Sequence, residues 1–266
     1  MRLEFLGTGT SFGVPEIGCN CAVCTSPDPR DRRWRSSIWV AHDDASLVVD
    51  ATPDFREQCL RSRLPRLDAL LLTHLHADHI FGLDDVRKYN YLQQMAMPVH
   101  LPPQYEARFR AIFHYALAEP PPGLTRPRFD VLPLDGAPLR FGDLEVQPVA
   151  VEHGAETIAG YLFSAHGWRC AYLTDCKELP PATKAAVHGV DVLILGALWD
   201  LPRRHAGHLN LAEALELAAE LAPRQTYLTH LTHMMGRHAE TQARLPPGVA
   251  LAHDGLVVTA PAPNGR

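Results

Sequence analysis

Four side chains that commonly bind transition metals are crowded into one short segment of the chain. They are His74, His76, Asp78 and His79, in the pattern HxHxDH directly after the apolar run 68–72. Alternating side chains at a strand end cannot all point into a hydrophobic core, but they can surround one or two cations. Neutral imidazoles together with a carboxylate suit zinc, iron or manganese. We interpret the segment as the first part of a metal site.

One short motif supplies too few ligands for a two-metal site, so further ligands must come from other strand ends. Three candidates directly follow or end apolar runs later in the chain, namely His153, Asp175 and His230. The ends of strands are where α/β proteins commonly place their chemistry. We therefore predict that these three residues complete the site that the HxHxDH motif begins.

Cys19, Cys21 and Cys24 form a second group of metal-binding residues, spaced C-x-C-x2-C. Six cysteines in 266 residues are too few for a disulfide scaffold. Three thiolates are one ligand short of a closed tetrahedral zinc site, and a histidine often completes such a set. His233 is the candidate fourth ligand, because it lies just after the last candidate of the first site. The alternative to this zinc-binding loop at 19–24 is a group of three buried free thiols.

Strands and helices must carry these side chains to one place. Apolar runs predict strands over 3–6, 37–41, 47–49, 68–72, 98–101, 144–151, 158–163, 169–173, 192–195, 226–228 and 256–260. Helical spacing predicts helices over 54–61, 82–94, 104–117 and 211–221. The two halves of the chain are typical of the strand and helix layers of one α/β domain over residues 1–266.

Composition and charge limit the classes of partner. Hydrophobic residues make up 46% of the chain and charged residues 21%, as in ordinary globular proteins. Apolar runs stay well short of the ~18 residues that a membrane span needs, and the N-terminus lacks the layout of a signal peptide. We therefore expect a cytoplasmic protein without a membrane partner. The net charge of -5 opposes long polyanions such as nucleic acid, but leaves small anionic substrates open.

The candidate ligands occur in the order of the five motifs of the metallo-β-lactamase superfamily, which the sequence resembles over nearly its whole length. The resemblance implies a four-layer αββα sandwich with the site at one edge of the two sheets. The ligand sets that it implies are His74, His76 and His153 for one metal and Asp78, His79 and His230 for the other, with Asp175 as the bridge. A water shared by two such ions would be deprotonated near neutral pH and become a nucleophile.

Three features together resemble one branch of that superfamily: the segment LGTGTS at 6–11, the cysteine loop and the segment THLHADHIFGLDD at 73–85. This PhnP-like branch contains the phosphoribosyl 1,2-cyclic phosphate phosphodiesterase of bacterial phosphonate breakdown. The resemblance implies hydrolysis of a small cyclic phosphodiester such as 5-phosphoribosyl 1,2-cyclic phosphate. It also implies two divalent ions in the active site, manganese or zinc, besides one structural zinc, and a homodimer.

The same branch implies a histidine just before the helix at 211–221 that assists the transition state. His208 fits this place best, and His205 is the substitute. The expected catalytic residues are thus His208 and the metal ligand Asp78. The imidazole would either stabilise charge on the phosphoryl oxygens or protonate the leaving alkoxide.

A basic run lies upstream of these motifs, at Arg30, Arg32, Arg33 and Arg35. We interpret the run as a solvated face of the protein. The alternative is that one guanidinium reaches a substrate phosphate, whose geometry it matches.

Other functions fit parts of the pattern. RNA-processing nucleases of the tRNA 3′-end type share HxHxDH and a histidine before a late helix. Two features count against them: the chain has no long basic arm for binding RNA, and its C-x-C-x2-C loop is not a feature of those nucleases. The pyrroloquinoline-quinone accessory protein resembles it in the N-terminal cysteines but is typically longer. A metal-binding or redox-sensing protein without turnover is the alternative from another class. The complete ligand set favours an enzyme over such a binder.

Overall fold

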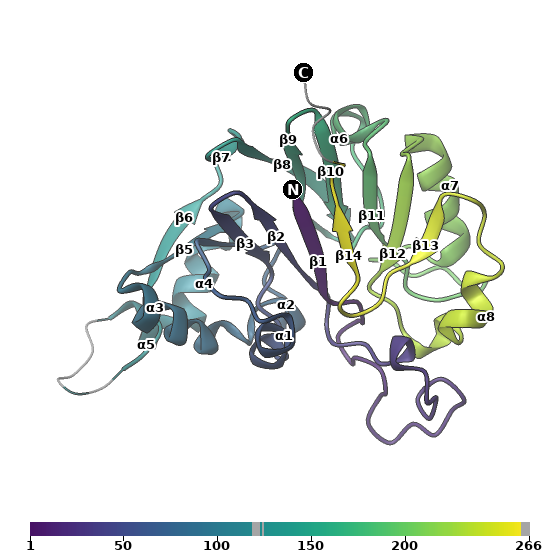
Figure 1. Cartoon of the computed structure of the whole chain (residues 1–266), viewed down its shortest axis with the longest axis horizontal. Helices are drawn as coiled ribbons and strands as arrows, with labels where there is room; N and C mark the ends of the chain where they lie inside the picture. Colours follow the sequence, from purple (N-terminus) through teal and green to yellow (C-terminus); the bar gives the residue numbers. More distant parts are fainter. Residues whose placement is uncertain (119–122, 124, 262–266) are drawn as a thin grey trace.

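A computed structural model describes residues 1–118, 123 and 125–261 of the chain. Within these residues two seven-stranded sheets face each other, and helices cover their outer sides (Figure 1). The strand order is β14-β1-β2-β3-β4-β5-β6 in the first sheet and β13-β12-β11-β10-β9-β8-β7 in the second. The αββα sandwich predicted from the sequence is confirmed.

The first sheet consists of β1 (Arg2–Gly7), β2 (Ser37–His42), β3 (Ala45–Val49), β4 (Ala69–Leu71), β5 (Met97–Leu101), β6 (Phe129–Pro133) and β14 (Val257–Thr259). The second consists of β7 (Leu139–Phe141), β8 (Leu144–His153), β9 (Glu156–Ala165), β10 (Trp168–Leu173), β11 (Val192–Gly196), β12 (Gln225–Thr229) and β13 (Val249–Leu251). Every predicted strand overlaps one of these. The edge strands β6, β7 and β13 are additional, because they are too short or too exposed to carry a long apolar pattern.

Parallel strands occupy one side of each sheet. Strands β3 to β6 are parallel to one another, and so are strands β10 to β13. The remaining pairs in both sheets are antiparallel. Since parallel strands end at the same edge of a sheet, the residues that follow β10 and β12 lie together at one edge of the second sheet, and those that follow β4 lie at an edge of the first.

Helices α1 (Phe55–Ser62), α2 (Ala77–Ile80), α3 (Arg87–Gln93), α4 (Glu106–Ile112) and α5 (His114–Leu117) lie on the side of the first sheet, and α6 (Pro181–Val187), α7 (Leu211–Leu221) and α8 (His238–Gln242) on the side of the second (Figure 1). The helix predicted over 82–94 begins as the 3₁₀ turn Leu83–Val86. The helix predicted over 104–117 is broken at Phe113, whose ring packs 4.9 Å from that of Phe109 and 6.0 Å from that of Phe129. Packing of these aromatic rings outweighs the local helical pattern.

Strand β3 is buried on both of its faces, which explains why its sequence is mostly apolar. Leu47 and Val49 face the second sheet and belong to the core between the sheets, whereas Val48 belongs to the core beneath the helices. All three are fully buried. Burial on both faces makes a strand read as a continuous apolar run, and each such side chain contributes roughly 1.5–3 kcal/mol.

The N-terminal segment after β1 runs along the edge of the sandwich where the candidate ligands lie. Gly7 passes so close to this segment that an added Cβ would stand 2.0 Å from the carbonyl oxygen of Arg35. Gly9 pairs with both Arg35 and Leu231, the residue after His230. The loop that carries the cysteines is thereby joined to the end of β12. Within the described ranges, helices are all too short or too polar to cross a membrane.

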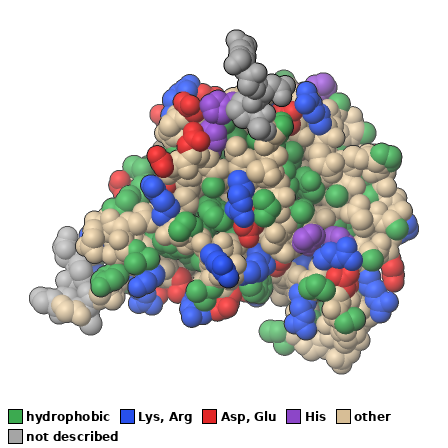
Figure 2. All heavy atoms as spheres, viewed as in Figure 1, with side chains coloured by type: hydrophobic (Ala, Val, Ile, Leu, Met, Phe, Trp, Pro, Cys, Tyr) green, Lys and Arg blue, Asp and Glu red, His purple; other side chains and the backbone are tan. Residues whose placement is uncertain are grey.

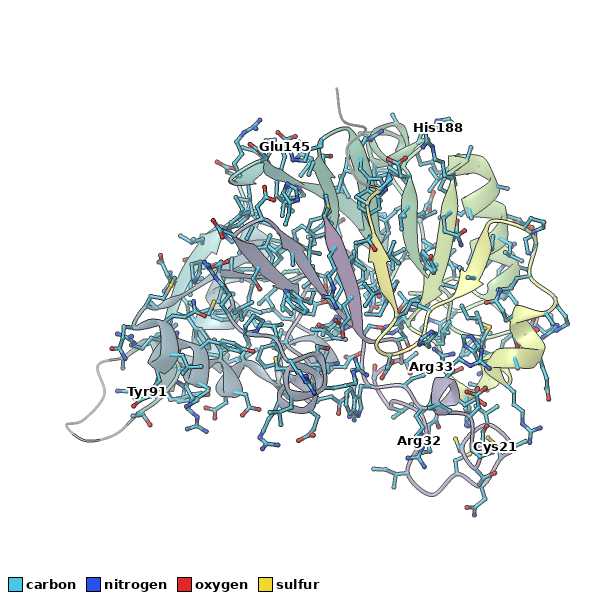
Figure 3. All side chains as sticks on the ribbon, in the orientation of Figure 1. Cys21, Arg32, Arg33, Tyr91, Glu145 and His188 are labelled. Atoms are coloured by element: carbon cyan, nitrogen blue, oxygen red, sulfur yellow. The ribbon has the colours of Figure 1, made fainter. Side chains whose placement is uncertain are left out.

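The basic run is not a solvated face as a whole, and that prediction is wrong for two of its members. Arg33 is only 4% exposed and donates hydrogen bonds to Thr8 Oγ1 at 2.8 Å and to the Ala252 carbonyl at 2.7 Å. Arg35 forms an ion pair with Asp54 at 2.9 Å. Arg30 and Arg32 are exposed, and Figure 3 shows Arg32 and Arg33 in the N-terminal segment near Cys21. Folding of the loop over the sheet edge buries Arg33 and partly buries Arg35, because hydroxyl, carbonyl and carboxylate groups there accept their hydrogen bonds.

Candidate metal centre

Strand ends bring the predicted ligands together from both sheets. His74 follows β4, His153 ends β8, and Asp175 follows β10. His230 follows β12, and the short helix α2 begins directly after His76 and contains the last two residues of the HxHxDH motif. The structure thus places all seven predicted ligands at one edge of the sandwich. Their roles as ligands remain predictions.

The first group of donors is compact. Donor atoms of His74, His76, His153 and Asp175 all lie within 4.8 Å of one another. Nε2 of His74 lies 2.8 Å from Nδ1 of His76 and 3.6 Å from Oδ2 of Asp175. Nε2 of His153 lies 4.0 Å from the same oxygen. Three imidazoles and a carboxylate in this space suit one divalent ion.

The second group shares Asp175 with the first. Donor atoms of His79, Asp175 and His230 also lie within 4.8 Å of one another. Oδ2 of Asp175 is 3.2 Å from Nε2 of His79, and its Oδ1 is 3.0 Å from Nδ1 of His230. Asp175 therefore faces both groups. Asp78 lies beside the second group. Its Oδ2 is 3.4 Å from Nε2 of His79 and accepts a hydrogen bond from Ser11 Oγ at 2.8 Å.

His79 tests whether these donors fit a cation. Its Nδ1 donates to Oδ2 of Asp50 at 2.7 Å, so Nε2 is the ring nitrogen left for a cation. Nε2 is buried and has no hydrogen-bond partner within the part of the chain that the structure describes. Burial lowers the pKa of His79, but the carboxylates of Asp175, Asp50 and Asp78 outweigh it and raise that pKa well above its ordinary value. Three carboxylates around one buried imidazole concentrate negative charge, and bound divalent ions would neutralise it. The donor set fits bound divalent metal ions.

Three residues at this edge have unusual backbone conformations. Asp50, Asp175 and His230 adopt left-handed φ angles of 62°, 55° and 59°. Such angles cost on the order of 1–3 kcal/mol in residues with a Cβ, and they concentrate at functional sites. Each one lies one or two residues after the end of a strand, so the chain turns sharply and its side chain is directed to the edge rather than to a sheet face.

Asp50 is a site residue that the sequence analysis does not include. Its carboxylate accepts hydrogen bonds from the backbone N–H and the hydroxyl of Thr73, at 2.8 and 2.9 Å, besides the one from His79. A carboxylate on the far nitrogen of a ligating imidazole fixes its orientation and raises its basicity. Asp50 follows β3 as Asp175 follows β10. The strand-end pattern used for the ligands was therefore also present at Asp50.

His153 is oriented by the segment before α7. Its Nδ1 donates to the carbonyl oxygen of Gly207 at 2.7 Å, so Nε2 faces the donor group. A Cβ on Gly207 would stand 2.9 Å from Cε1 of His153, which makes a side chain at this position incompatible with the contact.

His208 lies beside the metal centre, and His205 lies farther out. The His208 ring stands 4.7 Å from that of His153 and 5.0 Å from that of His230, measured between centroids. His205 is exposed and its Nδ1 accepts a hydrogen bond from the Gly207 backbone. Burial lowers the pKa of His208 to about 3, so its ring is neutral at physiological pH. A neutral imidazole suits hydrogen-bond donation to a phosphoryl oxygen better than proton transfer to a leaving group.

The start of α7 holds His208 in place. Asn210 and Glu213 form a reciprocal capping box, in which each side chain accepts a hydrogen bond from the other's backbone N–H. Lys177, two residues after Asp175, binds the Glu213 carboxylate at 3.0 Å. The helix start is thus joined to the loop that carries Asp175.

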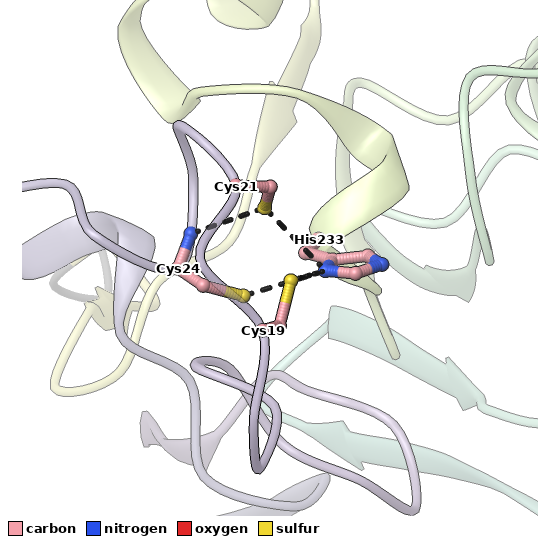
Figure 4. A group of neighbouring side chains, drawn as sticks. All are labelled: Cys19, Cys21, Cys24 and His233. Atoms are coloured by element: carbon pink, nitrogen blue, oxygen red, sulfur yellow. Dashed lines mark hydrogen bonds between the residues drawn. The ribbon is translucent and has the colours of Figure 1, made fainter.

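The cysteine loop forms a separate donor group with His233 (Figure 4). Sγ atoms of Cys19, Cys21 and Cys24 lie 3.3, 3.6 and 3.3 Å from Nδ1 of His233. A tetrahedral zinc with bonds of ~2.3 Å to sulfur and ~2.0 Å to nitrogen separates sulfur from nitrogen by about 3.5 Å. The four donors therefore already stand at the spacing of a closed zinc site.

The thiols differ in their tendency to ionise. A hydrogen bond from the Cys24 backbone N–H lowers the pKa of Cys21 to about 7, whereas burial raises that of Cys24 to about 12. Without a cation, Cys24 would stay protonated at neutral pH. A bound metal ion deprotonates coordinating thiols, so full use of this group requires the ion.

Comparison with known proteins adds independent findings. The profile of the family described as "Beta-lactamase superfamily domain" matches residues 46–231. An octanoyltransferase of Porphyromonas gingivalis is 33% identical over 258 residues, which cover 96% of this chain and 51% of that protein. The chain thus spans about half the length of this relative. Coenzyme PQQ synthesis protein B of Methylobacterium radiotolerans is 30% identical over 229 residues, covering 73% of this chain and 72% of that protein.

A solved structure extends the similarity over the whole fold. The crystal structure of "a New Diphosphatase from the PhnP Family" has a TM-score of 0.88 and 38% sequence identity to this chain, and 98% of each chain is covered. This neighbour agrees with the branch that the cysteine loop and the HxHxDH segment resemble.

Proposed function

This chain belongs to the metallo-β-lactamase superfamily, and on that premise we propose that it is a metal-dependent phosphodiesterase acting on a small cyclic phosphodiester such as 5-phosphoribosyl 1,2-cyclic phosphate. The observation that carries the proposal is that Asp175 faces two groups of histidines at once. This supports two adjacent divalent ions, manganese or zinc, that share its carboxylate. When bound, such ions lower the pKa of a coordinated water and neutralise charge on a phosphate.

The pKa shifts of Asp175 and His74 favour the forms of these side chains that bind metal ions. Burial raises the pKa of Asp175, but His230 and His79 outweigh it and hold that pKa well below its usual range, so the carboxylate is ionised. Burial lowers the pKa of His74 well below its ordinary value, so its imidazole is neutral and free to coordinate. His208 stands beside both groups, where its N–H can donate to an oxygen of the scissile phosphate.

Charge and surface features support a small substrate over a polymer. The net charge of -5 repels nucleic acid. In the basic run, Arg33 and Arg35 are held by partners within the protein. A cyclic ester keeps its leaving group tethered, so opening it requires only a compact site. Ring opening of 5-phosphoribosyl 1,2-cyclic phosphate would yield ribose 1,5-bisphosphate.

A second candidate is hydrolysis of a phosphoanhydride. It is favoured by the solved neighbour at 38% identity, which is named a diphosphatase. Both reactions add water at phosphorus and place negative charge on phosphoryl oxygens, so one metal centre suits either. The two candidates differ in the bond that breaks, which is an ester bond in the first and an anhydride bond in the second.

A substrate panel on the metal-loaded full chain tests the proposal. It contains 5-phosphoribosyl 1,2-cyclic phosphate, 2′,3′-cyclic nucleotides, a dinucleoside diphosphate and a tRNA precursor, with phosphorus NMR to identify products. We expect the highest kcat/KM for the cyclic ribose phosphate. A higher kcat/KM for the dinucleoside diphosphate would favour hydrolysis of a phosphoanhydride. A higher kcat/KM for the tRNA precursor would favour a nuclease. No turnover of any substrate would leave a metal-binding protein without catalysis.

We also propose that the chain forms a homodimer, as the resemblance to its branch implies. Light scattering on the metal-loaded protein would show twice the mass of one chain. A single-chain mass across the concentration range would remove this proposal without affecting the enzymatic one.

A further inference from the structure

A third group of metal-binding side chains lies at the opposite end of the sheets. His42 ends β2 and Asp43 stands in the turn to β3, while His166 stands in the turn between β9 and β10. Asp175 follows the carboxyl end of β10, whereas His166 precedes its amino end. The six residues of β10 extend over about 20 Å at ~3.3 Å per residue, so this group is far from the metal centre.

The donor atoms of this group are spaced closely enough to bind one metal ion. One donor atom from each of His42, Asp43 and His166 lies within 4.8 Å of the others. The two imidazole rings stand 5.2 Å apart between centroids, and Nε2 of His42 is 3.6 Å from Oδ2 of Asp43. These contacts join a turn of the first sheet to a turn of the second.

The imidazole of His42 has a buried nitrogen that makes no hydrogen bond within the described residues. The residue is 7% exposed, and its Nε2 is fully buried without a hydrogen-bond partner among residues 1–118, 123 and 125–261. A buried polar nitrogen without a partner destabilises the folded state. The atom faces Asp43, whose other surroundings are open to solvent. A cation between the two would remove this cost.

We propose that His42, Asp43 and His166 bind one divalent transition-metal ion, separate from the metal centre and from the cysteine loop. Two imidazoles and a carboxylate favour Ni²⁺, Cu²⁺ or Zn²⁺ over Mg²⁺ and Ca²⁺, which prefer oxygen ligands. Asp43 and His166 are exposed, so water completes the coordination. Because the ligands come from turns of both sheets, the ion stabilises the folded state and not the unfolded chain.

The competing explanation is an ion pair between a protonated His42 and Asp43. That pair involves only the turn after β2 and does not require His166. Metal binding requires all three residues. Substitution of His166 therefore separates the two explanations.

The variants are His166→Asn and Asp43→Asn. Both positions have left-handed φ angles, 49° and 48°, which asparagine adopts more readily than other residues with a Cβ. His188→Asn is the matched control, because His188 is an exposed histidine at the same end of the molecule but outside the group (Figure 3). Histidine side chains are visible on the surface at this upper end in Figure 2.

The experiment uses the full, untagged chain, first loaded with manganese and zinc. Ni²⁺ uptake is then measured by equilibrium dialysis with metal analysis, and thermal unfolding is recorded with and without Ni²⁺. Ni²⁺ that exchanges into the metal centre registers equally in all four proteins, so the comparison isolates the third group. Hydrolytic activity serves as the check that each variant is folded.

We expect the wild type and His188→Asn to bind one Ni²⁺ more than His166→Asn and Asp43→Asn. The affinity of this site for Ni²⁺ should fall at least ~100-fold in those two variants, more than the 10- to 100-fold typical of residues that only support a ligand. Ni²⁺ should raise the Tm of the wild type and of His188→Asn, but not that of the other two variants. Equal uptake by all four proteins would overturn the proposal. So would a loss of Ni²⁺ uptake in Asp43→Asn with none in His166→Asn, because the ion would then not require His166. Equal uptake together with a Tm that only Asp43→Asn lowers would identify the ion pair instead.

Discussion

The metal centre and the cysteine loop hold their side chains by different means. At the candidate metal centre, strand ends from both sheets supply the predicted ligands, and Asp50, Thr73 and Gly207 hydrogen-bond to their imidazole rings. In the cysteine loop, all three thiols come from one short turn region, and His233 comes from elsewhere in the chain. The sheets organise the first group of side chains in advance, whereas we expect the second to depend on a bound ion for much of its stability.

The largest effect is expected from Asp175→Ala at the metal centre. Its carboxylate faces both donor groups, so removing it weakens both ions. Because metal coordination lowers the pKa of water from 15.7 to about 7, loss of the ions should lower kcat/KM at least ~10⁴-fold. Metal analysis and hydrolysis of the cyclic substrate measure the change. The cysteine loop should keep its zinc in this variant, and normal activity with normal metal content would remove Asp175 from the site.

His208→Ala should act on the rate without emptying the centre. We expect both ions to remain and kcat to fall roughly 10²–10⁴-fold, the scale of one positioned catalytic group. His205→Ala is the matched control, since that exposed ring stands 4.9 Å from the His208 ring. Comparison of an alkyl diester with a p-nitrophenyl diester separates two roles. Equal losses indicate stabilisation of phosphoryl charge, and a greater loss on the alkyl diester indicates proton donation. No loss on either would exclude His208.

Asp50→Asn tests how far the surrounding hydrogen bonds organise the centre. The amide can still fill the space, but it lacks the charge that orients His79. Such partners typically account for about 10- to 100-fold in metal affinity or activity. Asp68→Asn is the control, since Asp68 accepts a backbone hydrogen bond at the other end of β4. Metal titrations that show the same affinity in both variants would contradict this role for Asp50.

Cys21→Ser should change activity least and zinc content most clearly. After mild chelation the wild type should retain about one zinc, because thiolates release ions less readily than oxygen and nitrogen ligands. The variant should retain none, while re-added manganese restores most of its hydrolysis. Cys59→Ser is the control, as Cys59 lies outside the loop. Retention of the tight zinc by Cys21→Ser would show that the loop is not its site.

The positions of most strands, of the ligands at their ends and of helix α7 were predictable from the sequence. The apolar runs marked most of the strands, and polar residues at their ends marked His153, Asp175 and His230 as members of one edge. Both signals depend on residues that are near one another in the chain. Helix α7 has the bounds 211–221 that its spacing predicts, because its own capping box determines where it starts.

Contacts between distant segments were decided only by the tertiary structure. Arg33 belongs to a run of arginines that looks solvated, yet it is buried because Thr8 and the carbonyl of Ala252 meet it there. The break at Phe113 and the approach of His42 to His166 likewise depend on segments that are far apart in sequence. Periodicity and spacing describe neighbours along the chain, whereas burial and hydrogen bonding depend on which surfaces the two sheets bring together when they pack.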